Sequence, residues 1–370
     1  MLSSAKRPLF WLGHGIRLAD AVPLIAPFLD RFQIPFITSW QGKDMVDNAH
    51  PLFYGHAGVY GHRAANNIVQ RADLIIAIGT RLALPQTGYD LKRFAPNAHL
   101  IVVDVDADES SKLSRGMAIQ RDAGVFMRDF MNLEPPCIAS KEWLDECESQ
   151  RIAHPWLEPG LHDDAKGYIN SYHFMWELNK WLKPDQIITT DMGTALLCAY
   201  PMLRLNGTQR LITSTGLGEM GFGLPAAVGA AIATGQEVLC LNCDGGMMFN
   251  LQELATVQHH RLPIKILIFD NGGYNMIRRS QEGLGMKDVA SGGNDLSFPS
   301  WSSIAAAFSM EWRLILNWRN FNEVIPWMQS HDGPCIVQVM MDPNQKFGPK
   351  VPTLKDENGN VYSPGLEVMV

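Results

Sequence analysis

The sequence predicts an α/β protein of two domains, each a mostly parallel sheet with helices on both faces. Three observations support this class. The chain has 370 residues, 46% of them hydrophobic and 19% charged, which is enough for two cores. In both halves, short apolar runs alternate with helix-like segments, a rhythm typical of βαβ units. The runs are continuously apolar, as expected for parallel strands that helices cover on both faces.

The first domain, a central Rossmann-like α/β domain, is predicted to span residues 1–133. Its first apolar run leads into Gly13-His14-Gly15. No glycine stands at position 18, so the dinucleotide-binding fingerprint is incomplete. We predict strands over residues 9–12, 34–38, 74–79 and 100–106, with helices ending near residue 32 and over 66–71.

Residues 134–166 are predicted to connect the two domains, because proline, glycine and polar residues replace the apolar runs there. The second domain is predicted at 167–345. The segment 346–370 is rich in turn residues and has little periodicity, so we expect an extended C-terminal tail. The predicted strands of the second domain cover residues 186–190, 210–213, 238–242, 264–269 and 335–340.

Composition excludes several classes of function. The formal net charge of -7 and the pI near 5.9 argue against nucleic acid as a partner, because affinity for phosphate backbones needs clustered Lys and Arg. No run approaches the roughly 20 apolar residues of a membrane span, so we expect no membrane association and a cytoplasmic location. The six cysteines are scattered and are expected to be free thiols.

Two glycine-rich turns follow consecutive predicted strands. The first is Cys243-Asp244-Gly245-Gly246, and the second is Asp270-Asn271-Gly272-Gly273. Both turns would lie at the carboxyl edge of the sheet, where such folds bind ligands. Their oxygen-bearing side chains suit Mg2+ bound together with phosphate oxygens, and their glycines let the backbone come close. On this pattern alone, ordinary turns of a parallel sheet explain the residues equally well.

A resemblance to a known family makes the prediction specific. Asp244 and Asn271 lie 27 positions apart, the spacing of the two metal-binding residues in thiamine diphosphate enzymes of the acetolactate synthase and pyruvate decarboxylase group. The stretch NLQELATVQHHRLPIKILIFDNGGYNMIR, from Asn250 to Arg278, resembles that group closely. The stretch STGLGEMGFGLPAAVGAAIA, from Ser214 to Ala233, resembles the segment that holds the aminopyrimidine ring.

The resemblance implies thiamine diphosphate and Mg2+ as cofactors and assigns roles to particular residues. Met220 would be the apolar wedge that keeps the cofactor folded, and the Gly218 carbonyl would accept from its 4′-amino group. The other implied roles are Mg2+ binding by Asp244, Asn271 and the Gly273 carbonyl, and diphosphate binding by Gly245, Gly246, Gly193 and Thr194.

The sequence departs from the family pattern at several points. Cys243 replaces the first glycine of the family's G-D-G motif, and Asp270 replaces the first asparagine of its Asn-Asn pair. In acetolactate synthases the central domain binds FAD. The residues 81–85 here read Arg-Leu-Ala-Leu-Pro in place of the usual Arg-Phe-Asp-Asp-Arg, which weighs against FAD.

The resemblance begins partway into the family pattern. Its N-terminal pyrimidine-binding domain and catalytic glutamate have no counterpart in this sequence, so we expect the glutamate to come from a partner chain in an oligomer, unless the chain is a truncated product. The implied reaction is decarboxylation of a small 2-oxo acid followed by carboligation. Simple decarboxylation remains an alternative, as does an accessory protein that binds thiamine diphosphate or a nucleotide without catalysis.

Overall fold

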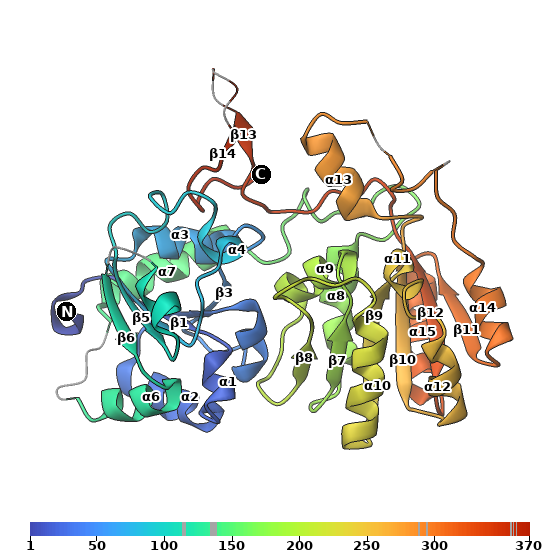
Figure 1. Cartoon of the computed structure of the whole chain (residues 1–370), viewed down its shortest axis with the longest axis horizontal. Coiled ribbons are helices and arrows are strands. Elements are labelled where there is room, and N and C mark those ends of the chain that lie inside the picture. Colours follow the sequence, from blue (N-terminus) through green and yellow to red (C-terminus); the bar gives the residue numbers. More distant parts are fainter. Residues whose placement is uncertain are drawn as a thin grey trace. The chain divides into compact units, whose positions relative to one another are not determined.

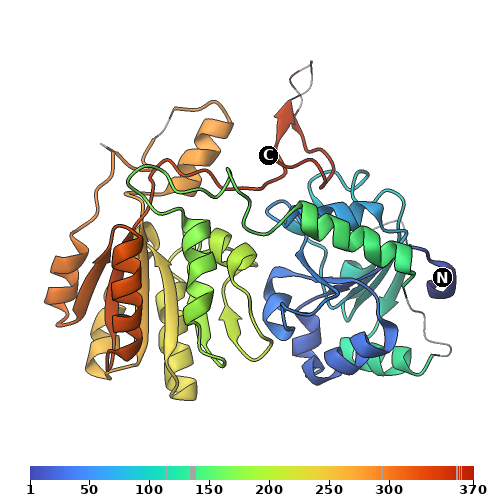
Figure 2. The ribbon, with the colours of Figure 1, turned by 180° about the vertical axis from the view of Figure 1, so that it is seen from behind.

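The chain folds into two compact units. The computed structural model describes residues 1–112, 116–133, 139–287, 289–293, 295–355, 357, 359 and 361–370. The first unit comprises Met1–Glu158, Leu205–Gly207 and Gly348–Val370, and the second comprises Pro159–Arg204 and Thr208–Phe347. Figures 1 and 2 show the two units from opposite sides.

The first unit is built on a six-stranded parallel sheet in the order β3-β2-β1-β4-β5-β6. Helices α3 and α7 pack on one face, and α1, α2 and α6 pack on the other (Figure 1). The strands are β1 (Pro8–Leu12), β2 (Phe36–Thr38), β3 (Phe53–His56), β4 (Leu74–Ile78), β5 (His99–Asp104) and β6 (Gly116–Gln120). The helices are α1 (Gly15–Leu18), α2 (Ile25–Phe32), α3 (Arg63–Arg71), α4 (Leu84–Thr87), α5 (Ala107–Ser111), α6 (Ala123–Met131) and α7 (Lys141–Ala153).

Aromatic rings pack in the core of this unit, and one long helix, α7, extends the unit beyond the predicted boundary at residue 133. The rings of Phe28 and Phe32 pack on Phe10 in the central strand β1, with centroids 4.8 and 6.0 Å away. Helix α7 buries Trp143 and Cys147. The Trp143 indole N–H donates to the Pro8 carbonyl at 2.8 Å. This helix lies within the predicted connecting segment 134–166, yet it contributes to the core of the first unit.

The second unit also contains a six-stranded parallel sheet, in the order β11-β12-β10-β9-β7-β8. Helices α10 and α12 cover the face turned toward the viewer in Figure 1, and α8 and α15 cover the face seen in Figure 2. The strands are β7 (Ile187–Thr190), β8 (Arg210–Ile212), β9 (Val238–Cys243), β10 (Ile264–Asp270), β11 (Glu311–Ile315) and β12 (Cys335–Met340). The helices are α8 (Ser171–Leu178), α9 (Thr194–Met202), α10 (Gly223–Thr234), α11 (Asp244–Met247), α12 (Glu253–His259), α13 (Asn275–Gly283), α14 (Trp301–Ala307) and α15 (Trp318–Ser330).

Short 3-10 helices and a small hairpin complete the fold. The tail was expected to be extended, and it contains the two-stranded antiparallel pair β13 (Leu354–Lys355) and β14 (Val361–Tyr362). The tail residues from Gly348 onward cluster with the first unit, not with the second. The 3-10 helices are η1 (Leu2–Ser4), η2 (Val22–Leu24), η3 (Trp40–Met45) and η4 (Asn179–Trp181).

The predicted fold class is confirmed, since both units contain a parallel sheet with helices on both faces. All nine predicted strands are present; the edge strands β3, β6 and β11 and the two strands of the tail hairpin, β13 and β14, are not among the predictions. Between β9 and β10 the sequence predicts one helix over about 247–259, and this prediction is wrong in extent, because the structure has two helices there: α11 ends at Met247 and α12 begins at Glu253. Among the described residues, none of the helices combines the length and apolar character needed to cross a membrane.

Candidate functional site

A cavity of about 380 Å3 lies within the second unit, at the carboxyl ends of β7, β9 and β10. Thr190 pairs with Leu241, and Cys243 pairs with Phe269, so the three strands end at the same edge. The chain passes from β7 to β8 on one side of β7 and then crosses to β9 on its other side. The cavity therefore lies at the point where the strand order reverses, the usual ligand site of such sheets.

All nine residues predicted from the resemblance line this one cavity. They come from the turns after three strands and from the loop that precedes α10. The residues are Gly193, Thr194, Gly218, Met220, Asp244, Gly245, Gly246, Asn271 and Gly273.

Asp244 joins the turns that follow β9 and β10. Its Oδ2 accepts hydrogen bonds from the backbone amides of Asn271, at 3.1 Å, and Gly273, at 3.0 Å. Its Oδ1 accepts from the Gly245 amide at 2.7 Å. Asp244 is fully buried, so these amides replace the water that a carboxylate would otherwise bind. The bonds fix the spacing of the two turns.

Electrostatics at Asp244 favour the arrival of a cation. Burial, and secondly the nearby negative charge of Asp270, raise the pKa of Asp244 from its ordinary value of 3.8 to about 7. The backbone amides of Gly245 and Gly273 oppose this rise. A divalent cation beside Asp244 would supply the positive charge that the described surroundings do not provide.

Asn271 carries an acceptor without a partner. Its Nδ2 donates to Thr194 Oγ1 at 3.2 Å, which leaves Oδ1 facing away from that bond. Oδ1 is buried and accepts no hydrogen bond from any residue that the structure describes, although Asn271 lines the cavity. Carboxylate and amide oxygens are ligands that Mg2+ prefers. Asp244 and Asn271 thus fit a hard cation held together with phosphate oxygens.

The glycines of the first turn allow close packing that no other residue would permit. A Cβ on Gly245 would lie 2.1 Å from Cε1 of Tyr274. A Cβ on Gly246 would lie 1.5 Å from Oδ2 of Asp191. Both positions are therefore restricted to glycine, which leaves the backbone of this turn exposed to the cavity.

The loop before α10 brings Met220 to the cavity. Gly218 has a φ of +70°, and a Cβ there would lie 2.4 Å from the methyl carbon of Met192. Met220 is half-buried and lines the cavity. Its thioether side chain is suited to contact an apolar ligand surface.

Cys243 also faces the cavity. Its Sγ accepts a hydrogen bond of 3.3 Å from the amide of Ala195, in the first turn of α9. Burial raises the pKa of the Cys243 thiol well above its ordinary value. The thiol is thus neutral. Its sulfur accepts the hydrogen bond of the Ala195 amide, which would otherwise be available to an anion at the start of α9.

Sequence reasoning missed the residues of α13. This helix and the residue that follows it contribute a further wall to the cavity. The missed residues recur at the spacing of one helical face, which is the signal that could have found them. They are Met276, Ile277, Ser280, Gln281 and Leu284, and Met192, Tyr274 and Asn275 also line the cavity.

A zinc site is not supported. Cys240 and Cys243 stand in a C-x-x-C pattern at the end of β9. Both are free and buried. Over the residues that the structure describes, no group of three or more His, Cys, Asp or Glu side chains is arranged to hold a metal.

The central domain does not offer an open crevice for a dinucleotide. Its strand order reverses between β1 and β4. There the Gly13 amide donates to the Ile78 carbonyl at 2.9 Å, and the Gly15 amide donates to the Gly79 carbonyl at 2.8 Å. A Cβ on Gly13 would lie 2.1 Å from the Gly79 oxygen. The turns are in direct contact and their amides are occupied, so these residues do not fit the diphosphate of FAD.

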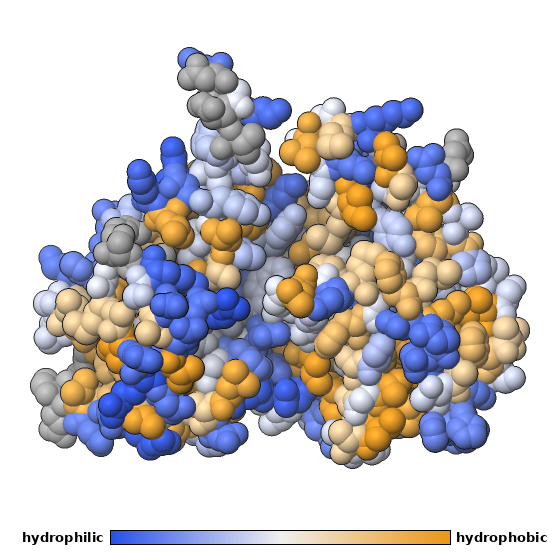
Figure 3. Space-filling view, in the orientation of Figure 1, coloured by the Kyte–Doolittle hydropathy of each residue, from blue (hydrophilic) through white to orange (hydrophobic). Residues whose placement is uncertain are grey.

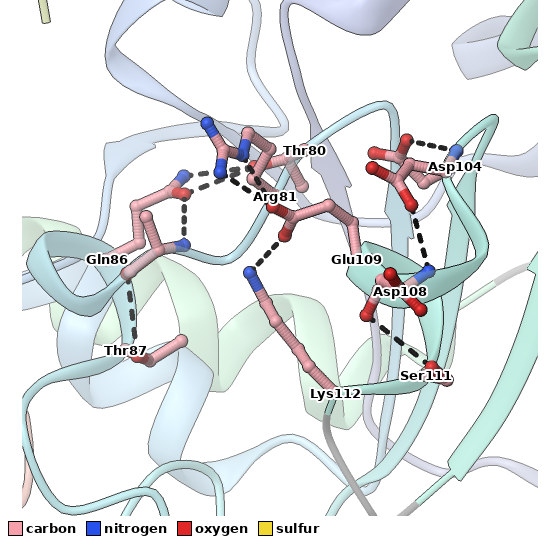
Figure 4. Close-up of polar contacts among 11 residues, drawn as sticks. Thr80, Arg81, Gln86, Thr87, Asp104, Asp108, Glu109, Ser111 and Lys112 are labelled. Atoms are coloured by element: carbon pink, nitrogen blue, oxygen red, sulfur yellow. Dashed lines mark hydrogen bonds and ion pairs between the residues drawn. The ribbon is translucent and has the colours of Figure 1, made fainter. Parts of the chain in front are cut away.

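Ion pairs lie close to these turns of the central domain, between Arg81 after β4 and Glu109 in α5 (Figure 4). Arg81 lies 2.6 Å from Oε1 of Glu109, and Lys112 lies 2.5 Å from its Oε2. The hydrogen bonds from Lys112 and Arg81 hold the pKa of Glu109 below its ordinary value. The Gln86 side chain is bonded to Thr80. The arginine of the family's flavin pattern is thus present as Arg81, but its guanidinium is paired with Glu109.

Comparisons with known proteins match both units. The family model described as the central domain of thiamine pyrophosphate enzymes matches residues 1–130, and the model of their C-terminal TPP-binding domain matches residues 191–339. The large subunit of acetolactate synthase isozyme 2 from Escherichia coli K12 is 33% identical over 354 residues. The isozyme 1 large subunit of the same strain is 30% identical over 360 residues, and a probable acetolactate synthase large subunit from Methanococcus aeolicus is 29% identical over 379.

The alignments cover most of this chain but only part of each relative. They include 95%, 95% and 97% of the chain, in the same order. The chain in turn spans 63%, 61% and 62% of the length of these relatives.

Proposed function

The chain belongs to the thiamine pyrophosphate enzymes, and we propose that its second unit binds thiamine diphosphate with Mg2+ for carbon–carbon bond chemistry on a small 2-oxo acid. The observation that carries this proposal is the convergence of Asp244, Asn271 and Met220 on one cavity at the reversal point of the sheet. The buried, unpartnered Oδ1 of Asn271 supports a cation there. The sequence relationship to acetolactate synthase large subunits favours carboligation as the outcome.

The residues of the cavity divide into two groups by chemistry. Asp244, Asn271 and the Gly273 carbonyl would hold Mg2+. The backbone amides of Gly245 and Gly246, with Gly193 and Thr194, would bind the diphosphate. The apolar wall at Met220 and the carbonyl of Gly218 would contact the aromatic rings of the cofactor.

When bound, thiamine diphosphate supplies a carbanion that adds to the carbonyl carbon of a 2-oxo acid and allows CO2 to leave. The contribution of this chain is to bind and orient. Met220 lies on the loop before α10, and the proposed metal ligands Asp244 and Asn271 lie on the turns after β9 and β10, so different elements would hold the two ends of the cofactor. Met276, Ile277 and Leu284 of the α13 wall would exclude water from the reacting carbon.

The glutamate that activates the cofactor in this family is proposed to come from a pyrimidine-binding domain on a second chain. Among the described residues, the cavity lining includes no glutamate. On the face drawn in Figure 3, apolar residues are exposed at many places on the second unit. Leu217, on the Met220 loop, is 87% exposed, and Leu284 at the cavity is 60% exposed. Apolar exposure of this kind beside a binding site is typical of surfaces that another domain covers.

The test measures binding and turnover separately. Purified chain is titrated with thiamine diphosphate in the presence and absence of Mg2+, and CO2 release from pyruvate is followed with and without a candidate pyrimidine-binding partner. Mg2+-dependent binding by the chain and CO2 release only with the partner are expected. An acetolactate product distinguishes carboligation from simple decarboxylation, which yields the aldehyde.

Two outcomes contradict the proposal. If no thiamine diphosphate binds even with partner and saturating Mg2+, the cofactor assignment is wrong. If the cofactor binds with the partner present but a series of 2-oxo acids yields no CO2, the chain is an accessory binding protein, the alternative that Cys243 at the cavity favours.

A further inference from the structure

The loop that carries Met220 is fixed at the next residue, Gly221. The Gly221 amide donates a hydrogen bond of 2.7 Å to Oδ1 of Asp191. The Gly221 carbonyl accepts a bond of 2.8 Å from Nδ2 of Asn250. Asp191 directly follows β7, and Asn250 lies between α11 and α12. Two side chains from separate parts of the second unit therefore hold both polar groups of one residue.

Close packing reinforces these two bonds. Gly221 has a φ of +88°, a conformation that residues with a Cβ rarely adopt. A Cβ there would lie 2.7 Å from Cβ of Phe249 and 2.8 Å from Nδ2 of Asn250. Gly221 is thus confined on the side of Asn250 by contact as well as by hydrogen bonding.

Asp191 connects this loop to the glycine turn. It is fully buried, and its own amide donates to the Leu241 carbonyl at 2.8 Å. Burial raises the pKa of its carboxyl group to about 6, although the amides of Gly221 and Gly223 oppose the rise. Its Oδ2 has no hydrogen-bond partner among the described residues and lies against Gly246, at the position a Cβ would occupy.

Neither Asp191 nor Asn250 is among the residues that line the cavity. We propose that these two are positioning residues that fix Gly221 and thereby hold Met220 against the cofactor. The inference rests on the proposed function, because it concerns the same cavity. It extends that function to residues that act through the loop and make no contact with the ligand.

The physical reason is preorganisation. A loop already held in its binding conformation loses less conformational freedom when the ligand arrives. One hydrogen bond of this kind is worth roughly a three- to tenfold change in binding. The effect should be confined to ligands that reach Met220, since the diphosphate turn keeps its own bonds to Asp244.

The experiment compares two probes by isothermal titration calorimetry at saturating Mg2+: thiamine diphosphate and inorganic diphosphate. Asn250→Ala is expected to weaken thiamine diphosphate about three- to tenfold and to leave inorganic diphosphate within about twofold. Met220→Ala should show the same separation. The double variant with Asn250→Ala and Met220→Ala should lose no more affinity for thiamine diphosphate than the more affected single variant, because both changes act on one contact.

Conservative variants provide the controls. Asn250→Asp has the same shape but no N–H donor, so it should behave like Asn250→Ala. Asp191→Asn keeps an acceptor for the Gly221 amide and should retain much of the affinity that Asp191→Ala loses. Thermal unfolding of each variant without ligand checks that it folds. If Asn250→Ala does not fold, Asn250→Asp and Met220→Ala provide the test.

Three results would overturn the inference: equal losses for both probes in the Asn250 variants, no loss for either, or additive losses in the combined variant. If the wild-type chain binds both inorganic diphosphate and thiamine diphosphate, and the Asn250 variants bind both with the same affinities, this inference alone is wrong. Wild-type chain that binds neither probe rejects the proposed function and this inference together.

Discussion

The backbone amide of Asn271 donates a hydrogen bond of 3.1 Å to Oδ2 of Asp244, and this bond joins the turns after β10 and β9. One carboxylate thus both sets the distance between the turns and faces the cavity that they form. The turn after β10, which carries Asn271, is therefore already held close to Asp244 before a cation binds.

Replacement of Asp244 should abolish Mg2+-dependent binding. We expect Asp244→Ala to lower the affinity for thiamine diphosphate at least about 100-fold, because loss of a group that only supports a ligand already costs about 10–100-fold. Titration calorimetry at saturating Mg2+ measures this. The control is Asp270→Asn measured at about pH 8 or above, where affinity no longer depends on the ionisation of Asp244, since Asp270 is outside the lining and its carboxylate accepts from Gln338 at 2.7 Å. Wild-type affinity in Asp244→Ala would reject the assigned ligand.

Binding of Mg2+ should depend on pH. The pKa of Asp244 is raised to about 7 by burial and by Asp270, and the cation needs the ionised form. Below about pH 7, affinity should therefore fall by up to about tenfold per pH unit and level off above it. The same raised pKa means that stability of the metal-free chain decreases as pH rises from about 4 to 7. Calorimetry between these limits checks both slopes.

Asp270→Asn supplies the matched variant for this pH profile. Removal of its charge should move the lower limit of tight Mg2+ binding to a lower pH, because Asp270 is the second cause of the raised pKa. A profile that stays flat in the wild-type chain would show that Asp244 does not titrate with the metal.

Gly246→Ala should be strongly destabilising. Its Cβ would lie 1.5 Å from Oδ2 of Asp191, and neither group can move away within the buried turn. We expect a loss of more than about 2 kcal/mol in the free energy of unfolding, measured by urea denaturation. Gly229→Ala, in the middle of α10, is the control. No atom of the described part of the chain lies within 4 Å of a Cβ there, so this change should stabilise by about 0.5–1 kcal/mol. Equal effects would contradict the packing at Gly246.

Cys243→Ala should strengthen binding of diphosphate. The change frees the Ala195 amide from the thiol, and that amide lies in the first turn of α9 beside the cavity. A gain of about threefold in affinity for inorganic diphosphate is expected from one additional amide donor. Cys240→Ala, which is buried in the same strand but outside the cavity lining, should leave the affinity unchanged. Weaker binding in Cys243→Ala would mean that the thiol helps to hold the ligand.

The chain should bind no FAD. The amides of Gly13 and Gly15 are bonded to the turn after β4, and Arg81 is paired with Glu109. Equilibration with FAD followed by gel filtration should leave the protein fraction without flavin absorbance, as in a parallel run with Glu109→Gln. Flavin that stays with the wild-type chain would show that these turns separate on binding.

The sequence predicts the interior strands of both sheets and one edge strand, β8, but misses the other three edge strands, β3, β6 and β11. Most of the predicted strands, such as β1, β4 and β10, are largely apolar runs, as expected for parallel strands that helices cover on both faces. The three missed strands lie at sheet edges, where solvent replaces one neighbour. Gly55 interrupts β3, Gly116 begins β6, and Glu311 and Arg313 alternate with apolar residues in β11. Their pattern is too weak to identify from hydrophobicity alone.

The site was predictable where its residues follow strands and unpredictable where packing decides. Asp244 and Asn271 stand at strand ends, so topology alone places them together. The helical spacing of Met276, Ser280 and Leu284 marks one face of α13, but the sequence does not say that this face borders the cavity, because that depends on how the helix lies over the sheet. Asp191 and Asn250 reach Gly221 from distant positions in the chain, and only the folded structure relates them.

The unpartnered oxygens of Asn271 and Asp191 make the metal-free chain less stable than its packing would otherwise allow. A bound cation that contacts Asn271 Oδ1 would remove the cost of leaving that oxygen without a partner. Any ligand that binds only the folded chain also raises the free energy of unfolding in proportion to the logarithm of its concentration. The melting temperature of this protein should therefore report the supply of cofactor around it. Scarcity of cofactor would raise the unfolded fraction and expose the chain to proteolysis, so its abundance would follow the cofactor supply.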